Sequence, residues 1–388
     1  MVMRVLLNSA EQSPFSFTSS CKELETALSR LSGVVNTSAS GTKNFVVVSL
    51  KGKVAVLAFN TDTYAYIELK EATAVEDGAF GFDSQVMLGM IKGRSSMTFT
   101  FTGSECEFKL VKGKYNGKFL VLPVTTDQAT TVNSALSSKG KGEDTTLARG
   151  VLDALKEGLT LTGIKDIYSG GSLLSYLNLS TKGVLTVSCF DQHHFGHYSR
   201  KAEQKGVTFK IALPTSHFQL IDKMVGEDDA KFYIKSESIR VEGHNFVLIL
   251  PASQAEDKNY GLVADYMASL DKPDLRGMVD LAKLATLTEN LFTIYSANTS
   301  FELSYAGAAI LGVKFSTNNG SAADSLKIAE VTGSSLKVKV EPRVFRDVLS
   351  LIQSQGEAAI SLKKEKWARL DVSPKSGATL SFVCALNL

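Results

Sequence analysis

Residues 80–91 read FGFDSQVMLGMI, which is a short alternating strand that runs directly into a compact apolar helix. The pattern returns as FKIALPTSHFQLIDKM at residues 209–224 and as LKVKVEPRVFRDVLSLI at residues 336–352. Aligning Asp83, Pro214 and Pro342 makes the period roughly 130 residues, far longer than the ~20–50 residues of a solenoid repeat. The sequence therefore predicts a small α+β domain that is present in three tandem copies.

Other landmarks repeat at the same spacing. Lys51-Gly52 and Lys182-Gly183 each mark a hairpin tip between apolar runs, and Pro123 and Pro251 each close a copy. Each copy also opens with a helix that has apolar residues three or four positions apart, so that one face packs on a core. These helices contain Leu24, Leu28 and Leu31, then Leu147, Val151, Leu155 and Leu159, then Leu284, Leu287 and Leu291. Each copy is thus predicted to run helix, strands, helix, strands.

Two segments between the copies read as linkers. Residues 125–143 are almost free of large apolar side chains, and residues 255–274 lie between the second and third apolar patterns. The predicted domains are therefore residues 1–125, 143–255 and 274–388.

The composition limits the function classes. Hydrophobic residues make up 44% of the 388 residues, which is enough for packed cores, and the formal net charge is only +2. There is no apolar run of about 18 residues and no secretory signal, so we expect a cytoplasmic protein without a membrane partner. The four cysteines, Cys21, Cys106, Cys189 and Cys384, form no CxxC pair, as expected in a reducing compartment.

Motifs of common enzymes are missing from the sequence. It contains no GxxxxGK[ST], no GxGxxG that opens a helix, and no HExxH, so we expect no cofactor and no catalytic site. One cluster supports an alternative. Asp191, His193 and His197 would share one face of a strand, and two histidines with a carboxylate are plausible transition-metal ligands. The alternative function is therefore a metal-dependent hydrolase that uses these three residues.

Several short stretches, in this order, resemble the bacterial beta sliding clamp, the processivity factor of replicative DNA polymerase. They are Leu31-Ser32-Gly33, Asn60-Thr61-Asp62, Tyr176-Leu177-Asn178, the run from Val187 to Phe195, and the run from Phe382 to Leu388. Gln192, His194 and Ala385 depart from the residues usual in the family, and its members are usually strongly acidic. These departures indicate a divergent member, for which a phage-encoded protein of the host cytoplasm is one candidate.

The resemblance implies a fold, a function and a set of partners. In that family three similar domains per chain, in two chains, close into a ring with helices inside and sheets outside. The ring encircles double-stranded DNA without sequence preference and tethers a DNA polymerase, and a clamp loader is a further expected partner. On this reading the chain is a homodimeric, non-enzymatic accessory protein.

A ring of this kind needs cations on the exposed faces of its helices, where they attract phosphates weakly. At about 100° per residue, six cations lie opposite the apolar faces of their helices, while Arg149 shares its polar face with acidic residues. The resemblance adds Lys43 and Tyr176 as DNA contacts. The predicted DNA-facing residues are Lys22, Arg30, Lys43, Lys92, Arg149, Tyr176, Lys223, Arg343 and Arg346. An ordinary solvated helix face is the alternative explanation of the charges alone.

The resemblance also implies a pocket where partner proteins dock a short peptide. The matching positions are Leu177, His193, His194, Phe195, Phe382, Val383, Cys384 and Leu386. An ordinary terminal strand and its core is the other reading of Phe382, Val383 and Leu386. Separately, Lys109, Lys112, Lys114 and Lys118 surround Tyr115 in a predicted hairpin with a basic tip. The sequence leaves open whether this tip contacts DNA, contacts a polymerase, or is only solvated.

Overall fold

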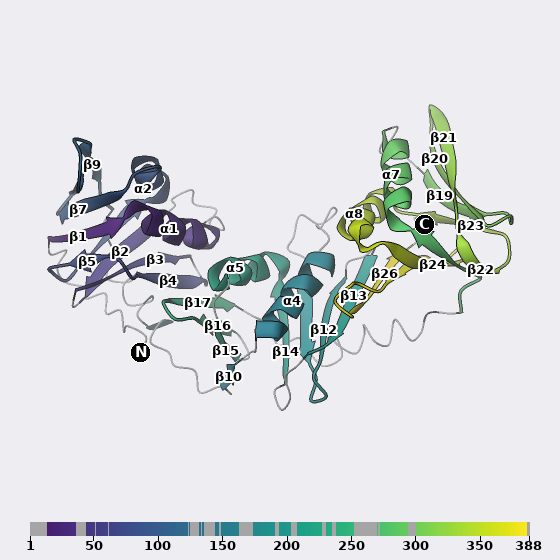
Figure 1. Ribbon diagram of the computed structural model, residues 1–388, viewed down its shortest axis with the longest axis horizontal. Helices are drawn as coiled ribbons and strands as arrows, with labels where there is room; N and C mark the ends of the chain where they lie inside the picture. Colours follow the sequence, from purple (N-terminus) through teal and green to yellow (C-terminus); the bar gives the residue numbers. More distant parts are fainter. Residues whose placement is uncertain are drawn as a thin grey trace. The chain divides into compact units, whose positions relative to one another are not determined.

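The computed structural model describes most of the chain as antiparallel sheets backed by helices (Figure 1). The described residues are 14–35, 44–50, 52–60, 62–122, 124, 132, 134–135, 144–146, 149–162, 174–190, 194–202, 208–226, 230–234, 238–251, 270, 272–293 and 300–385. They divide into two compact units, which are treated separately below. Unit 1 comprises Met1–Leu147 and His217–Ser253, and unit 2 comprises Ala148–Ser216 and Gln254–Leu388. No helix among the described residues is long and apolar enough to cross a membrane.

Unit 1 contains a five-stranded sheet and an eight-stranded sheet. The first has the order β5-β1-β7-β8-β9 and the second the order β10-β15-β16-β17-β4-β3-β2-β6. The strands are β1 (Phe15–Ser20), β2 (Asn44–Leu50), β3 (Lys53–Phe59), β4 (Tyr64–Leu69), β5 (Thr73–Ala74), β6 (Gly78–Asp83), β7 (Ser96–Thr102), β8 (Glu105–Leu110), β9 (Asn116–Leu120), β10 (Asp144–Thr146), β15 (Lys231–Ile234), β16 (Ser238–Glu242) and β17 (Phe246–Pro251). The helices are α1 (Cys21–Val35), α2 (Ser84–Ile91) and α5 (Thr215–Val225).

Unit 2 contains a nine-stranded sheet and a four-stranded sheet. Their orders are β14-β11-β12-β13-β26-β25-β24-β18-β22 and β21-β20-β19-β23. The strands are β11 (Leu174–Leu179), β12 (Val184–Phe190), β13 (His194–Lys201), β14 (Phe209–Pro214), β18 (Leu275–Asp280), β19 (Ser300–Tyr305), β20 (Ile310–Thr317), β21 (Gly320–Lys327), β22 (Ala329–Gly333), β23 (Leu336–Val340), β24 (Glu357–Lys363), β25 (Trp367–Val372) and β26 (Thr379–Ala385). The helices are α4 (Arg149–Thr162), α7 (Leu281–Phe292), α8 (Pro342–Ile352) and the 3-10 turn η1 (Gln353–Gln355).

The predicted passage from strand directly into helix is confirmed in all three sequence repeats. Strand β6 runs into α2, β14 into α5 and β23 into α8. Asp83 caps α2, since its carboxylate accepts a hydrogen bond of 2.7 Å from the Gln85 backbone N–H. In the third repeat Pro342 is the first helical residue and Glu341 is the cap, so Glu341 takes the place of Asp83. The α+β fold class predicted from the sequence is therefore confirmed.

The glycines predicted at hairpin tips have left-handed backbones. Gly52, between β2 and β3, has φ 78°, and Gly183, between β11 and β12, has φ 71°. Both values lie where a Cβ is disfavoured, which explains the glycine at the same place in two copies. Gly81 has a different role. A Cβ there would lie 2.8 Å from the Leu122 carbonyl oxygen, with which Gly81 exchanges backbone hydrogen bonds.

A cluster of phenylalanines forms the core beneath the five-stranded sheet of unit 1. Phe15 and Phe17 lie opposite Phe101 and Phe99 on β7, with ring centroids 5.1 Å apart in both pairs. Phe80 of β6 reaches the same cluster, 5.8 Å from Phe15 and 5.3 Å from Phe101. Alternation along β1, β6 and β7 places every second side chain on this face, so the pattern that begins at residue 80 determines which face is buried.

We expect Phe101→Ala to destabilise unit 1 by about 3–5 kcal/mol, because it opens a cavity among rings that are fully buried. Urea unfolding followed by circular dichroism would measure the change. Phe101→Leu, which keeps most of the volume, should give a smaller loss and guards against a variant that fails to fold. Val75→Ala is the matched control, since Val75 is 90% exposed. Equal unfolding midpoints for Phe101→Ala and Val75→Ala would contradict this view of the core.

Candidate functional site

Three of the cations predicted on helix faces are exposed in the structure. They are Lys22 on α1, Lys92 just after α2, and Lys223 on α5. Lys223 Nζ donates a 2.9 Å hydrogen bond to Ser32 Oγ at the end of α1, so α1 and α5 are neighbours within unit 1. An exposed ammonium group remains solvated and can exchange this partner for a phosphate at little cost.

The predicted arginines are held more closely than these lysines. The guanidinium of Arg30 lies over the Phe246 ring at 5.1 Å, and the side chain is half-buried. Arg343 is half-buried in the first turn of α8, where its backbone N–H donates to the Glu341 carboxylate at 3.4 Å. Arg149 begins α4, but its side chain and the whole of Lys43 lie outside the described residues. Tyr176 is buried in β11, and burial raises the pKa of its phenol.

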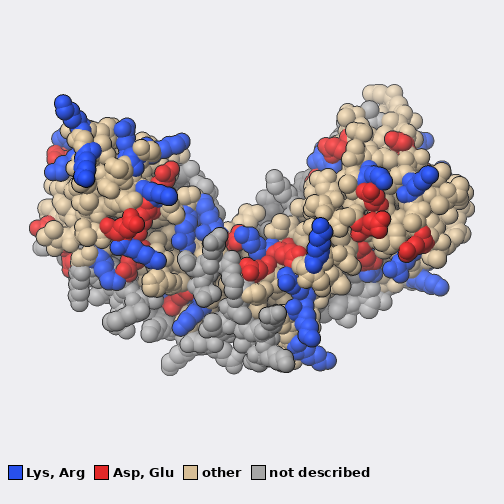
Figure 2. Space-filling model, in the orientation of Figure 1, with Lys and Arg blue, Asp and Glu red and all other residues tan. Residues whose placement is uncertain are grey.

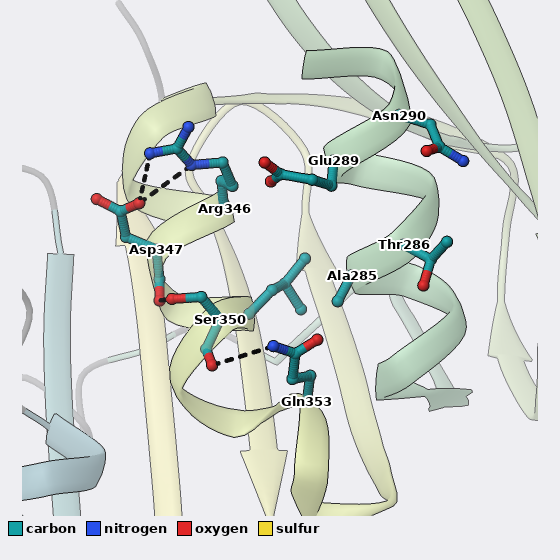
Figure 3. A pocket seen from close by; sticks show the side chains of 9 residues that line it. Ala285, Thr286, Glu289, Asn290, Arg346, Asp347, Ser350 and Gln353 are labelled. Atoms are coloured by element: carbon teal, nitrogen blue, oxygen red, sulfur yellow. Dashed lines mark hydrogen bonds and ion pairs between the residues drawn. The ribbon is translucent and has the colours of Figure 1, made fainter. Parts of the chain in front are cut away.

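Helices α7 and α8 of unit 2 border a cleft of about 570 Å³ (Figure 3). Polar side chains from both helices line it. They are Thr286, Glu289 and Asn290 from α7, Arg346, Asp347 and Ser350 from α8, and Gln353 at its end. The Ser350 hydroxyl and the Gln353 amide donate hydrogen bonds to α8 carbonyls. Figure 3 shows the Glu289 carboxylate directed toward Arg346, so the cleft holds charges of both signs.

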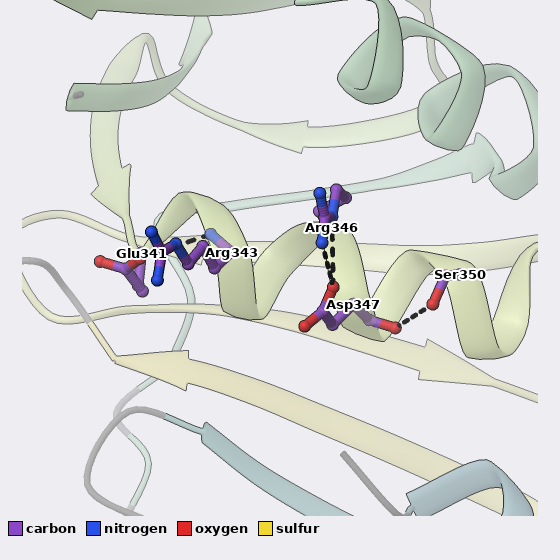
Figure 4. A network of polar contacts seen from close by, with 5 residues as sticks. All are labelled: Glu341, Arg343, Arg346, Asp347 and Ser350. Carbon is purple, nitrogen blue, oxygen red and sulfur yellow. Dashed lines mark hydrogen bonds and ion pairs between the residues drawn. The ribbon is translucent and has the colours of Figure 1, made fainter. Parts of the chain in front are cut away.

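Arg346 is constrained on two sides in this cleft. Its Nη2 lies 3.0 Å and its Nε 3.2 Å from Asp347 Oδ1 (Figure 4). Its Cζ lies 4.2 Å from the centre of the Phe292 ring. A cation that is already paired with a carboxylate and stacked on a ring must give up part of both contacts to bind another anion. The positive charge on this part of α8 is therefore largely compensated by Asp347.

The predicted partner-pocket residues divide between the two faces of the nine-stranded sheet. Phe195 on β13 pairs with Val383 on β26, and both pack against Trp367 of β25, with Leu270 alongside. Phe382 points to the opposite face, because a Cβ built on Gly196 would lie only 3.1 Å from its ring. Leu177 and Cys384 are buried. His193 and Leu386 lie outside the described residues, and for His194 only the backbone is described.

Trp367 was not among the residues predicted from the sequence. It is the only tryptophan in the chain, and it begins β25, where a short turn after β24 ends. Arg369, two positions further along β25, lies opposite Val383, and its Nε donates to Asp371 Oδ1 at 2.7 Å. The sequence repeat could have pointed to this position, because unit 1 carries residues that correspond to those around Trp367.

Unit 1 repeats the same register on its eight-stranded sheet. Tyr64 on β4 pairs with Ile249 on β17, and Ile249 pairs with Arg240 on β16, which forms an ion pair with Glu242. An aromatic residue, a β-branched residue, an arginine and a carboxylate thus recur in the same arrangement as Phe195, Val383, Arg369 and Asp371. The difference lies at the start of the third strand, where unit 1 has Ser238 and unit 2 has Trp367.

The histidine cluster is only partly described. His197 Nδ1 lies 2.9 Å from Ser188 Oγ, and burial, together with the charge of Arg369, lowers the pKa of this imidazole. Asp191 and His193 lie outside the described residues. In the part of the chain that the structure describes, no three His, Cys, Asp or Glu side chains approach closely enough to hold a metal ion. Nothing in these contacts favours the metal-dependent hydrolase.

Comparison with solved structures gives matches over nearly the whole chain. A putative DNA polymerase III β subunit from Eubacterium rectale is 15% identical, with a TM-score of 0.77, and covers 96% of this chain and 99% of its own. The β subunit from Streptococcus pyogenes is 11% identical, with a TM-score of 0.79, and covers 96% of this chain and all of its own. The DNA polymerase sliding clamp from Bacillus subtilis is 11% identical, with a TM-score of 0.76.

The chain has the fold of a sliding clamp. The resemblance noted in the sequence is thus confirmed at the level of the fold, over 96% of the chain. No protein-family model matches the sequence, and no curated protein matches it. The similarity therefore lies in the arrangement of helices and strands, and the residues that carry the clamp pattern are few and widely spaced.

Proposed function

We propose that this protein is a sliding clamp that encircles double-stranded DNA and tethers a replicative DNA polymerase, without catalysing a reaction itself. The observation that carries the proposal is the match in fold to β subunits of DNA polymerase over 96% of the chain. Its partners would be DNA of any sequence, a polymerase, a clamp loader and a second copy of the chain. Its place of action would be the cytoplasm, or the host cytoplasm if a phage encodes it.

We infer that the three sequence repeats, residues 1–125, 143–255 and 274–388, are the domains of this clamp. Their strands combine across the repeat boundaries. Strands β15 to β17 of the second repeat continue the sheet of β2 to β4, and β11 to β14 of the second repeat continue the sheet of β24 to β26. A compact unit can therefore contain parts of two repeats while the repeat remains the domain.

Processivity by encirclement is a topological mechanism, so the inner surface has to attract phosphates without gripping them. Exposed Lys22, Lys92 and Lys223 suit this role, because solvated ammonium groups bind phosphates weakly and carry no sequence information. The half-buried Arg30 and Arg346 would contribute less, since the guanidinium of each is already engaged. Weak and distributed contacts let a ring slide.

A second copy could close the ring through strand edges. In the described sheets, β9 lies at one edge of the unit 1 sheet, and β21 lies at one edge of a unit 2 sheet. Leu120 on β9 is 74% exposed, and β21 is exposed along most of its length. A free edge offers backbone donors and acceptors to another strand, and an exposed leucine beside it favours a covered state. We infer that β9 of one copy pairs with β21 of the other, twice per ring.

We also infer that a partner peptide docks at the cluster of Phe195, Trp367 and Val383, whose side chains are buried and contact the partly buried Leu270, so that docking has to uncover them. All three are apolar and adjacent, and Arg369 beside them offers a charged group for orientation. Once uncovered, a small apolar cluster with a few fixed polar groups beside it suits the Leu and Phe anchors of an extended peptide.

Encirclement predicts that the protein is retained on nicked circular DNA and released when the circle is cut. Gel filtration of the protein with each DNA form would measure retention. Leu120→Asp should abolish retention and give a monomer in light scattering, because a charge at the proposed β9–β21 edge opposes its burial. Val75→Asp, at another exposed site of unit 1, should behave as wild type. Equal retention on circular and linear DNA would exclude the topological mechanism.

The pairing of Arg346 with Asp347 predicts that Asp347→Asn increases DNA association at low salt. The substitution removes the carboxylate that competes with phosphate for the guanidinium, and the effect should disappear at high salt. Retention times on nicked circles across a salt series would measure it. In the double variant Arg346→Ala/Asp347→Asn the increase should vanish, since the two changes act on one contact. An unchanged increase in the double variant would mean that Arg346 is not the group released.

The partner surface predicts that a synthetic peptide with Leu and Phe anchors changes the fluorescence of Trp367, the only tryptophan. Phe195→Ala should weaken this binding by roughly 30-fold, which is typical of losing a buried anchor. Tyr64→Ala, the corresponding position of unit 1, is the matched control and should leave the titration unchanged. If Phe195→Ala and Tyr64→Ala bind the peptide equally well, the surface has been placed wrongly.

A further inference from the structure

Two tight turns lie together at one end of unit 1, and Lys92 is their one residue that was also named above among the duplex-facing lysines. The first, residues 92–95, follows α2, and the second, residues 111–115, joins β8 to β9. Backbone hydrogen bonds hold them in place. The Val111 N–H donates to the Ser96 carbonyl at 3.0 Å, and the Leu110 N–H donates to the Tyr115 carbonyl at 2.9 Å. The start of α1 supports the first turn, since the Cys21 N–H donates to the Ser95 carbonyl at 2.8 Å.

The two turns concentrate charge of one sign. Lys92 and Arg94 come from the first turn, Lys112 and Lys114 from the second, and all four side chains are exposed. There is no Asp or Glu in residues 84–104 or in residues 108–126. In the described part of the chain, no carboxylate forms an ion pair with Lys92, Lys112 or Lys114. Figure 2 shows Lys and Arg side chains projecting from the end of unit 1 that carries α2 and β9.

This concentration contrasts with the chain as a whole, where 42 basic residues face 40 acidic ones. It also contrasts with Lys118 on the adjoining strand β9, whose ammonium group forms an ion pair with Glu105 of β8 at 3.0 Å. Four exposed cations on neighbouring turns, with no acidic residue in either stretch, raise the local potential and attract polyanions. We name Lys92, Arg94, Lys112 and Lys114, with Tyr115, the basic turn pair.

The basic turn pair also has a flat, ordered component. The Arg94 guanidinium lies 4.0 Å above the centre of the Tyr115 ring, and the Tyr115 ring packs against Phe108, with centroids 5.5 Å apart. Stacking on a supported ring holds the guanidinium plane in one orientation and leaves its outer face open to solvent, since Arg94 is exposed. Bases of a single strand stack on such arginine planes, whereas the bases of a duplex are already stacked on one another.

We propose that the basic turn pair binds single-stranded DNA, with phosphates on Lys92, Lys112 and Lys114 and a base stacked on Arg94. The site would hold an unpaired strand, a ligand different from the duplex of the proposed function. It does not depend on ring closure, because all its residues belong to one unit of one chain. Contact with single strands gives a clamp a second, short-range hold on DNA.

The test measures binding of the full-length protein to a fluorescent oligothymidylate by anisotropy across a salt series. We expect Lys112→Ala/Lys114→Ala to weaken binding roughly tenfold or more at low salt. The slope of log affinity against log salt should fall by about 1.4, since each single-strand phosphate contact contributes about 0.7. Lys201→Ala/Lys231→Ala is the matched control, because it removes two other exposed lysines and the same net charge. An equal loss in the control would overturn the proposal in favour of diffuse attraction.

A second variant separates stacking from charge. Arg94→Lys keeps the positive charge but removes the plane, so binding should weaken several-fold while the salt slope stays unchanged. If Arg94→Lys binds the oligonucleotide as tightly as wild type, no base stacks on Arg94, and the proposed stacking is overturned. Binding of heparin or poly-glutamate as tight as that of the oligonucleotide would also overturn it, because the site would then select charge alone.

Failure of this site can be told apart from failure of the clamp function. Lys112→Ala/Lys114→Ala should keep its retention on nicked circular duplex and its mass in light scattering, since ring closure is assigned to the β9–β21 edges. Loss of single-strand binding with retained encirclement supports the basic turn pair. Loss of both, together with a monomeric mass, would assign these lysines to the contact between copies and overturn the single-strand site.

Discussion

Backbone hydrogen bonds between β4 and β17, and between β13 and β26, are the interactions on which the rest of this chain depends. They pair Ile67 with Phe246 and Phe195 with Val383, which lie far apart in the sequence. Each bond set joins strands of two sequence repeats into one sheet, so neither repeat ends at a bare edge there. Pairing these distant strands requires the closure of long loops, which lowers the conformational entropy of the chain before any hydrogen bond forms. Such contacts therefore form slowly during folding. The helices on such a sheet therefore pack against a layer built of strands from two sequence repeats.

The same register produces the same arrangement of side chains in both units, and one difference distinguishes them. Tyr64, Ile249 and Arg240 occupy the positions of Phe195, Val383 and Arg369, including the ion pair of each arginine with a carboxylate two residues later. Trp367 stands where unit 1 has Ser238, and it adds a large buried apolar side chain beside Phe195. The proposed partner site would therefore exist in one unit and not in the other, because the units differ there in a side chain and not in the backbone.

Charge is distributed to suit weak attraction. The net charge is small, and several cations on the helices are balanced locally, as Arg346 is by Asp347. Lys22 lies at the start of α1, whereas Lys223 of α5 contacts Ser32 near the end of α1, so the two exposed ammonium groups are far apart, as the proposed diffuse contact with phosphates requires. The turns at residues 92–95 and 111–115 are the exception within the described chain, since four cations there have no acidic neighbours in sequence.

The sequence by itself determined the repeat, the α+β class and the passage of strand into helix, because these follow from local rules. Alternation in FGFD buries Phe80 and Phe82 together, Asp83 caps the helix that follows, and Gly52 and Gly183 permit left-handed turns. It also indicated which helix positions are polar. Only the tertiary structure decided what each cation contacts. It placed Arg30 over Phe246, paired Arg346 with Asp347, and set Trp367 against Phe195. Those contacts join residues that no period relates, since they depend on strand register and on sheets shared between repeats.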